Sequence, residues 1–244
     1  MSKLGKYLIF IGILFKNRET FRTYVRLTLD ECILIGINSI VLVSIVSVFM
    51  GAVSTVQTAF NLVNPIIPKN VIGLVVRDLT ILELAPTITA IIFAGKVGSS
   101  IAGNLGTMRI TEQIDALEVM GINSASYLVL PKIVATLIMY PLLVILAGVL
   151  AISGGYLAAR FGEVLPVTDY LNGLRLNFNQ FGVAFALIKS VVFGFLISSV
   201  SAFMGYYTKG GALEVGQAST QAVTVSCIAI LCSDFILAQL LLVK

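Results

Sequence analysis

Long apolar runs alternate with short polar segments along the chain. Five runs are long enough for a membrane-spanning helix, which needs about 20 consecutive apolar residues. The runs are residues 32–60, 81–105, 133–157, 183–207 and 218–243. The pattern therefore predicts an all-α integral membrane protein with five transmembrane helices.

The segment before the first run follows a different pattern. Aromatic and apolar residues recur on one helical face, whereas Arg22 and Arg26 fall on another. This arrangement predicts a helix over residues 3–28 that lies in the membrane interface instead of crossing the bilayer. A basic tail without regular structure is the alternative that the pattern leaves open.

The composition supports a membrane protein and excludes several kinds of site. Mean hydropathy is +1.01 and 11% of residues are charged, whereas about a quarter are charged in soluble domains. The chain has no histidine, and its three cysteines lie in or beside apolar runs without metal-ligand spacing. We therefore expect no catalytic residues, no metal site and no cofactor bound by this chain, which is not expected to be an enzyme.

The basic residues indicate an orientation because Lys and Arg gather on the cytoplasmic side of membrane proteins. With the N-terminus inside, ten lie at or near the cytoplasm, five lie on the other side, and Lys189 lies within a span. This orientation makes the segment between the second and third spans cytoplasmic. The basic residues form no concentrated patch, so nucleic acid is not an expected partner.

That cytoplasmic segment contains the stretch RITEQIDALEVMGI, residues 109–122. Its acids recur every third residue, away from an apolar stripe: Glu112, Asp115 and Glu118. The pattern predicts a short helix over residues 107–121 that lies along the membrane with an acidic face toward the cytoplasm. A solvated loop helix and a docking helix for a cytoplasmic protein both fit this pattern.

The preceding stretch, AGKVGSSIAGNLG, carries small residues at helical spacing, which allow close packing of membrane helices. Its Gly95–Lys96 pair does not make a phosphate-binding loop. That motif needs another glycine at the position of Ala90 and Ser or Thr at the position of Val97. We therefore expect no ATP site on this chain.

Three charged residues lie in or near the apolar runs, where a charge is costly and is usually paired or functional. They are Glu83, Lys189 and Asp234. The depths of Lys189 and Asp234 predict an ion pair between them, with a structural role favoured over a transport relay. Glu83 has no obvious partner.

The first run has a polar face with two interpretations. Its small and polar residues include Ser47, Gly51, Ser54 and Thr58. The face could pack against another helix or form the wall of a polar-tolerant cavity.

The segment LELAPTITAIIFAGKVGSSIAGNLGTMRITEQIDALEVMGI, residues 82–122, resembles the signature segment of MlaE-type permeases. These are the membrane subunits of ABC transporters that move phospholipids between membranes of diderm bacteria and chloroplasts. Residues 187–194, 210–223 and 233–241 are also similar to this family. Asn104 departs from the pattern, because many members carry Glu there.

The resemblance implies a single permease domain over residues 1–244, located as a multi-pass protein in the inner membrane. It implies a homodimer with a phospholipid cavity between the protomers, to which the polar face of the first span is a candidate contributor. A cytoplasmic ABC ATPase would bind ATP, and an external MCE-domain protein would cap the outer face. The helix over residues 107–121 would be the coupling helix, with the docking role carried by Arg109, Glu112, Gln113, Asp115 and Glu118.

Two other functions remain as alternatives. A secondary transporter of a small solute or ion would use Glu83, Lys189 and Asp234 as a relay and would need no ATPase. A membrane scaffold would have no transport role.

Overall fold

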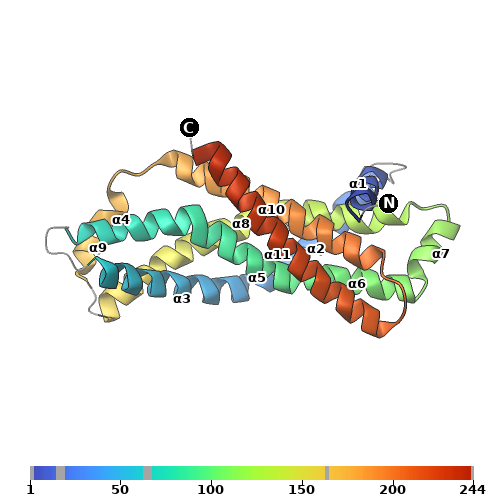
Figure 1. Ribbon diagram of the computed structural model, residues 1–244, viewed down its shortest axis with the longest axis horizontal. Helices are drawn as coiled ribbons and strands as arrows, with labels where there is room; N and C mark the ends of the chain where they lie inside the picture. The colour runs from blue at the N-terminus through green and yellow to red at the C-terminus, as the bar shows by residue number, and fades with distance from the viewer. Residues whose placement is uncertain (1–2, 15–19, 63–67, 163–164, 243–244) are drawn as a thin grey trace. The chain divides into compact units, whose positions relative to one another are not determined.

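The computed structural model describes residues 3–14, 20–62, 68–162 and 165–242 (Figure 1). Within these ranges the regular elements are all helices. Four helical stretches are long and apolar enough to cross a membrane: Phe21–Asn61, Ser124–Phe161, Gln180–Tyr206 and Ala212–Leu242. The predicted class, an all-α membrane protein that crosses the bilayer several times, is therefore confirmed.

The second predicted span, residues 81–105, is helical but divided. The chain is helical from Asn70 to Ile110 in five consecutive segments. They are α4 (Asn70–Leu79), η2 (Thr80–Ile88), α5 (Thr89–Phe93), η3 (Ala94–Gly98) and α6 (Ser99–Ile110). The π-helical η2 contains Pro86, which has no backbone N–H to donate. This stretch is not one of the four long helices, and the fifth span stays a prediction.

The N-terminal segment differs from the single helix predicted over residues 3–28. It forms α1 (Lys3–Ile13) and α2 (Phe21–Cys32), and residues 15–19 between them lie outside the described ranges. Thr20 has an extended backbone, with ψ of 142°, which interrupts helical hydrogen bonding before Phe21. Expecting one continuous helix was therefore wrong.

The α2 helix continues into the first span. It passes through the π-helical η1 (Ile33–Ile37) directly into α3 (Asn38–Asn61). The first long helix therefore begins well before the apolar run at residue 32. An amphipathic segment and a span share one helix here, because no Pro separates them and Gly36 lies within the helical η1.

The later elements follow the prediction more closely. They are α7 (Gln113–Val119), α8 (Ser124–Phe161), α9 (Val167–Arg175), α10 (Gln180–Tyr206) and α11 (Ala212–Leu242). The predicted spans 133–157, 183–207 and 218–243 coincide with α8, α10 and α11, although α10 ends before Tyr207 and residue 243 lies outside the described ranges.

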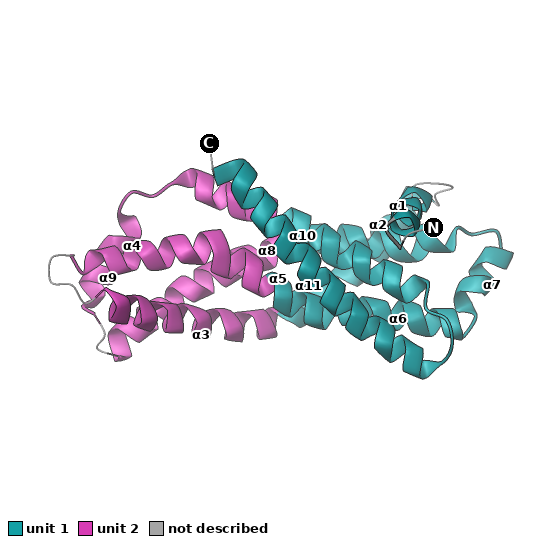
Figure 2. Ribbon diagram, viewed as in Figure 1, with its two compact units in different colours: residues 1–39, 90–140, 191–244 teal, residues 40–89, 141–190 magenta. Residues whose placement is uncertain are grey.

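The chain divides into two compact units, coloured separately in Figure 2. Unit 1 comprises residues 1–39, 90–140 and 191–244, and unit 2 comprises residues 40–89 and 141–190. Whether they act as the single permease domain expected from the sequence stays a prediction.

In unit 1, α11 packs against α6 and η3. The small residues of the AGKVGSSIAGNLG stretch permit this packing. Gly205 of α10 lies directly against the backbone of Ala102, and Gly106 faces the side chain of Val215 on α11. A β-carbon on Gly205 would overlap Ala102, so glycine allows the two helices to approach closely.

In unit 2, α4 packs against α9 around a small apolar core. The fully buried members of this core are Ile72, Val76, Ala159, Leu165 and Tyr170. The Tyr170 hydroxyl donates a hydrogen bond to the Ile152 carbonyl at 3.0 Å. Burial raises the pKa of Tyr170 to about 12, so this hydroxyl remains a donor at physiological pH.

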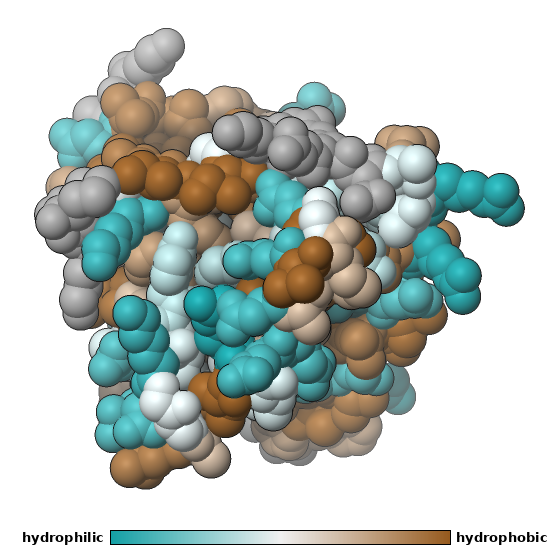
Figure 3. Space-filling view, turned by 90° about the vertical axis from the view of Figure 1, so that its right-hand side faces the viewer, coloured by the Kyte–Doolittle hydropathy of each residue, from teal (hydrophilic) through white to brown (hydrophobic). Residues whose placement is uncertain are grey.

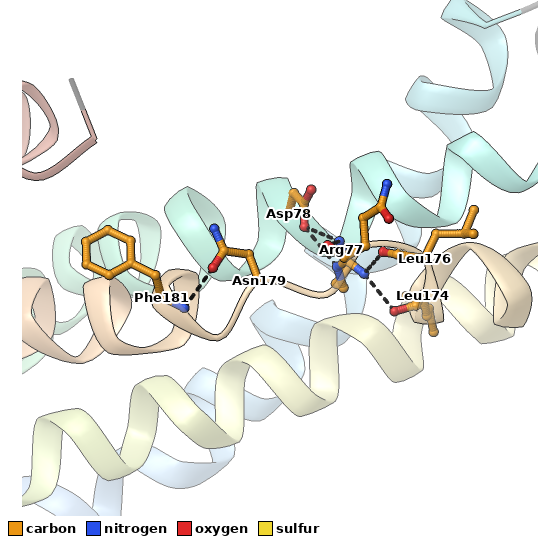
Figure 4. Close-up of polar contacts among 7 residues, drawn as sticks. Arg77, Asp78, Leu174, Leu176, Asn179 and Phe181 are labelled. Atoms are coloured by element: carbon orange, nitrogen blue, oxygen red, sulfur yellow. Dashed lines mark hydrogen bonds and ion pairs between the residues drawn. The ribbon is translucent and has the colours of Figure 1, made fainter. Parts of the chain in front are cut away.

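A buried arginine of α4 forms hydrogen bonds with the end of α9 (Figure 4). Arg77 is 3% exposed and donates hydrogen bonds to the carbonyls of Leu174 at 2.9 Å and Leu176 at 2.6 Å. Its guanidinium also pairs with Asp78 at 2.7 Å. The last carbonyls of a helix have no partner within the helix, and Arg77 satisfies those at the end of α9.

Replacing Arg77 with Ala is therefore expected to destabilise the protein by about 3 kcal/mol, because two carbonyls at the end of α9 lose their charge-assisted hydrogen bonds to a buried guanidinium. The measurement is thermal unfolding of the purified chain in detergent. The matched control is Arg175→Ala, because Arg175 is exposed on α9. Equal unfolding temperatures for the two variants would contradict the role given to Arg77.

Candidate functional site

The segment between α6 and α8 forms a polar end of unit 1. The helix predicted over residues 107–121 is not continuous, because α6 ends at Ile110 and α7 begins at Gln113. Glu112 between them has a left-handed backbone with φ of 61°. That conformation costs an L-residue about 1–2 kcal/mol, and it turns the chain sharply between the helices. The expectation of one helix was wrong here because helical periodicity does not register a single left-handed residue.

An ion pair crosses this turn. Nη1 of Arg109, in the last turn of α6, lies 2.7 Å from Oδ1 of Asp115 in α7. Both side chains are partly exposed, so the pair contributes no more than about 1 kcal/mol. The pair joins the last turn of α6 to the first turn of α7.

The inner face of α7 is held by one apolar and one polar anchor. Ile114 is completely buried. Oε1 of Glu118 accepts a hydrogen bond from the Ser124 hydroxyl at 2.8 Å and from the Tyr206 hydroxyl at 3.1 Å. Because Ser124 begins α8 and Tyr206 ends α10, Glu118 ties α7 to two long helices of the unit.

The same end of unit 1 holds α1. The Asn123 side chain donates a hydrogen bond to the Ile13 carbonyl at 3.1 Å. Phe10 is completely buried, with its ring centroid 5.4 Å from that of Tyr206 and 5.7 Å from that of Phe203. The aromatic rings and the Glu118 network therefore share Tyr206.

The outer face of α7 and its flanking residues is free of these contacts. Glu112, Gln113, Ala116, Val119 and Met120 are all exposed and recur at helical spacing. We call these five residues the α7 outer face. Val119 is 89% exposed and Met120 is 65% exposed. Figure 3 shows the end of the molecule that carries α7, where hydrophilic side chains gather with hydrophobic ones among them.

Two of these residues escaped the sequence analysis. Val119 and Met120 lie off the apolar stripe of the segment, although they are apolar. Their position off the stripe was the feature by which the sequence could have revealed them, because clustered apolar residues on an exposed surface can mark an interaction site. Conversely, Arg109, Asp115 and Glu118 were predicted to dock a partner but are engaged within the chain.

The chain is similar to known proteins over most of its length. The model of the family described as Permease MlaE matches residues 28–240. The chain belongs to the MlaE permease family. A "Probable ABC transporter permease protein" of Rickettsia bellii is 35% identical over 239 residues, covering 98% of this chain and 92% of the relative.

Two further relatives extend the range of organisms. A probable ABC transporter permease protein of Synechocystis is 37% identical and covers 88% of this chain and 82% of the relative. The protein TRIGALACTOSYLDIACYLGLYCEROL 1, chloroplastic, of Arabidopsis thaliana is 30% identical and covers 88% of this chain and 61% of the relative. The MlaE permease described here is therefore an ABC transporter permease that crosses the membrane several times.

In this permease, Lys189 has a partner that the sequence analysis did not assign. Lys189 is 1% exposed, and its ammonium lies 2.9 Å from Oε2 of Glu83 and 3.0 Å from the Leu82 carbonyl. The expectation that Glu83 lacks a partner was wrong, because a regular helical projection does not place a residue of the π-helical η2 correctly. The predicted pairing of Lys189 with Asp234 joins residues of different units and stays a prediction.

The polar face of α3 lies against α8 in unit 2. Ser47 and Thr58 are buried, and Gly51 lies directly against the backbone of Ala151. The void beside Ser47 is about 10 Å³, at the lower limit for one water molecule. Within the unit this arrangement fits helix packing, the alternative that the sequence left open. Ser54 is half-buried on the same helix.

Replacing Tyr206 with Phe is expected to loosen α7, because the ring packing remains while the hydrogen bond to Glu118 is lost. A loss of about 1 kcal/mol corresponds to roughly fivefold faster amide exchange over residues 113–119. The measurement is hydrogen–deuterium exchange with mass spectrometry. Tyr207→Phe is the matched control, because its ring also packs on Phe10. The same exchange rates in both variants would refute a tethering role for the Tyr206 hydroxyl.

Proposed function

We propose that this chain is the membrane subunit of an ABC transporter that moves phospholipids between the inner and outer membranes. A separate cytoplasmic ATPase drives the movement. Membership in the MlaE permease family supports the transporter class. The Arabidopsis relative, whose name is that of a galactolipid, supports a lipid as the transported molecule.

The α7 outer face is the observation that carries the coupling part of the proposal. It combines an acidic residue, Glu112, with the exposed apolar side chains of Val119 and Met120. An apolar centre with polar residues at its rim is typical of protein interfaces. We assign to this face the role of docking into a cleft of the ATPase.

The residues behind this face transmit the movement. ATP would close the ATPase dimer and displace the docked α7. Because Glu118 is hydrogen-bonded to Ser124 and Tyr206, displacement of α7 pulls on the start of α8 and the end of α10. The helices α8 and α10 would then shift as rigid elements from one packed arrangement to another and change the shape of the lipid cavity.

The remaining parts of the assembly are proposed from the family. The permease would act as a homodimer in the inner membrane, with five spans in each protomer and the second span formed by residues 81–105. A lipid cavity would lie between the protomers, and an MCE-domain protein would cap the outer face. Ser47, Gly51, Ser54 and Thr58 remain candidates for shaping that cavity through the packing of α3.

Two charge-introducing variants test docking: Glu112→Arg and Val119→Arg. Each is expected to reduce co-purification of the co-expressed ATPase about tenfold, the effect of losing one central contact of an interface. Arg175→Glu is the matched control, because it changes charge at an exposed position of unit 2. ATPase yields that equal those of the unmodified permease in both α7 variants would exclude this face as the docking site.

Tyr206→Phe tests transmission separately from docking. The α7 outer face is unchanged, so the ATPase is expected to co-purify normally. Lipid transported per ATP hydrolysed is expected to fall several-fold in proteoliposomes, whereas Tyr207→Phe retains the original ratio. If the Tyr206 variant transports with unchanged stoichiometry, the hydrogen bond between Tyr206 and Glu118 has no part in transmission.

A further inference from the structure

A second polar site lies in unit 1, about two helical turns before Arg109 along α6. It is a cavity of about 260 Å³ lined by residues of α2, η1, α3, η3, α6 and α8. Its polar side chains are Glu31, Asn38, Lys96, Ser100, Asn104 and Lys132. A cavity with this many polar groups among membrane helices is unusual, because each polar group there has a desolvation cost.

Two π-helical segments meet at this cavity. Leu34 and Ile35 come from η1, and Lys96 and Val97 come from η3. The Lys96 ammonium donates a hydrogen bond to the backbone carbonyl of Asn38, where η1 passes into α3. Because π-helical turns are less stable than α-helical ones and occur frequently at functional sites, their meeting here indicates a site and not only packing.

The charges of the cavity do not cancel. Lys132 is buried and forms an ion pair with Glu31. Lys96 forms no ion pair with any carboxylate in the described part of the chain. The cavity therefore carries one net positive charge, and Ser100 and Asn104 present exposed polar groups in its wall.

We propose that this cavity binds a phosphate group, with Lys96 as its principal cationic contact. Lysine binds phosphate as a point charge, and the Asn104 amide and Ser100 hydroxyl supply neutral donors beside it. At about 30 Å³ per water molecule, 260 Å³ accommodates a phosphate group but not a whole diacyl lipid. A metal cation does not fit, because two ammonium groups line the same cavity.

This inference rests on the proposed function for the source of the phosphate, which we take to be a phospholipid headgroup. The acyl chains would then extend from the cavity into the bilayer. A soluble phosphate would satisfy the same chemistry, so the experiment distinguishes the two sources.

The test measures binding to the purified full-length chain in detergent, without an ATPase. The probes are fluorescent phosphatidylglycerol and a fluorescent diacylglycerol with the same acyl chains. Lys96→Gln is expected to weaken phosphatidylglycerol binding about tenfold, as expected for one charge-assisted hydrogen bond, and to leave diacylglycerol binding unchanged. Lys96→Arg is expected to retain phosphatidylglycerol binding within about threefold, because the charge and its donors remain.

Two variants of Asn104 test the site even if the Lys96 variants do not fold. Asn104 is exposed, so substitutions there are expected to fold. Asn104→Glu adds a carboxylate that neutralises the cavity and is expected to weaken phosphatidylglycerol binding, whereas Asn104→Gln is not. Lys209→Gln removes an exposed lysine outside the cavity and is the charge control.

The outcomes are distinct. Unchanged phosphatidylglycerol binding in Lys96→Gln, or an equal loss for both lipids, overturns the assignment. Where phosphatidylglycerol binding does not depend on Lys96, thermal stabilisation by inorganic phosphate that does depend on Lys96 identifies a soluble phosphate as the ligand. Failure of ATP-driven transport by the unmodified complex, with Lys96-dependent binding intact, would reject the proposed function and leave the phosphate site standing.

Discussion

The hydrogen bonds to Glu118 are the interaction on which the functional interpretation depends. Without them α7 would be held by the buried Ile114, by the partly exposed Arg109–Asp115 pair and by its two connecting segments, one of which contains the left-handed Glu112. With them, one carboxylate is bonded to the start of α8 and the end of α10. The buried Ile114 and the Arg109–Asp115 pair fix the other side of the same short helix. A helix of seven residues cannot be stable alone, so these tertiary contacts define its position.

The sequence predicted the long helices well for a physical reason. A membrane span must satisfy every backbone hydrogen bond internally, so an apolar run of sufficient length has few alternatives to a helix. That argument applies to α8, α10 and α11, whose runs carry few charges. It is weaker between Asn70 and Ile110, where Pro86 and Lys96 lie in π-helical turns that periodicity does not represent.

The sequence was less informative about the site, because exposure depends on tertiary contacts. All three acids of residues 112–118 look equivalent in a helical projection. In the structure Asp115 and Glu118 are bonded within the chain, whereas the Glu112 side chain, at the turn, forms no hydrogen bond or ion pair with the described residues. The partner of Glu83 was missed similarly, because Lys189 lies more than a hundred residues away and only the folded unit brings them together. The apolar Val119 and Met120 lie off the apolar stripe, and the sequence pattern assigned them no role.

The different bonding of the three acids separates two roles within residues 112–120, docking to a partner and transmitting its movement. Glu118 accepts hydrogen bonds from a residue of α8 and a residue of α10, and breaking those bonds to dock would cost more than a surface contact returns. Glu118 is therefore suited to transmitting the movement of α7 to α8 and α10. Glu112, Val119 and Met120 are suited to contacting the partner that moves α7. Because one short helix carries both sets on opposite faces, a partner can move α7 as a rigid body without competing for the contacts that connect it to α8 and α10.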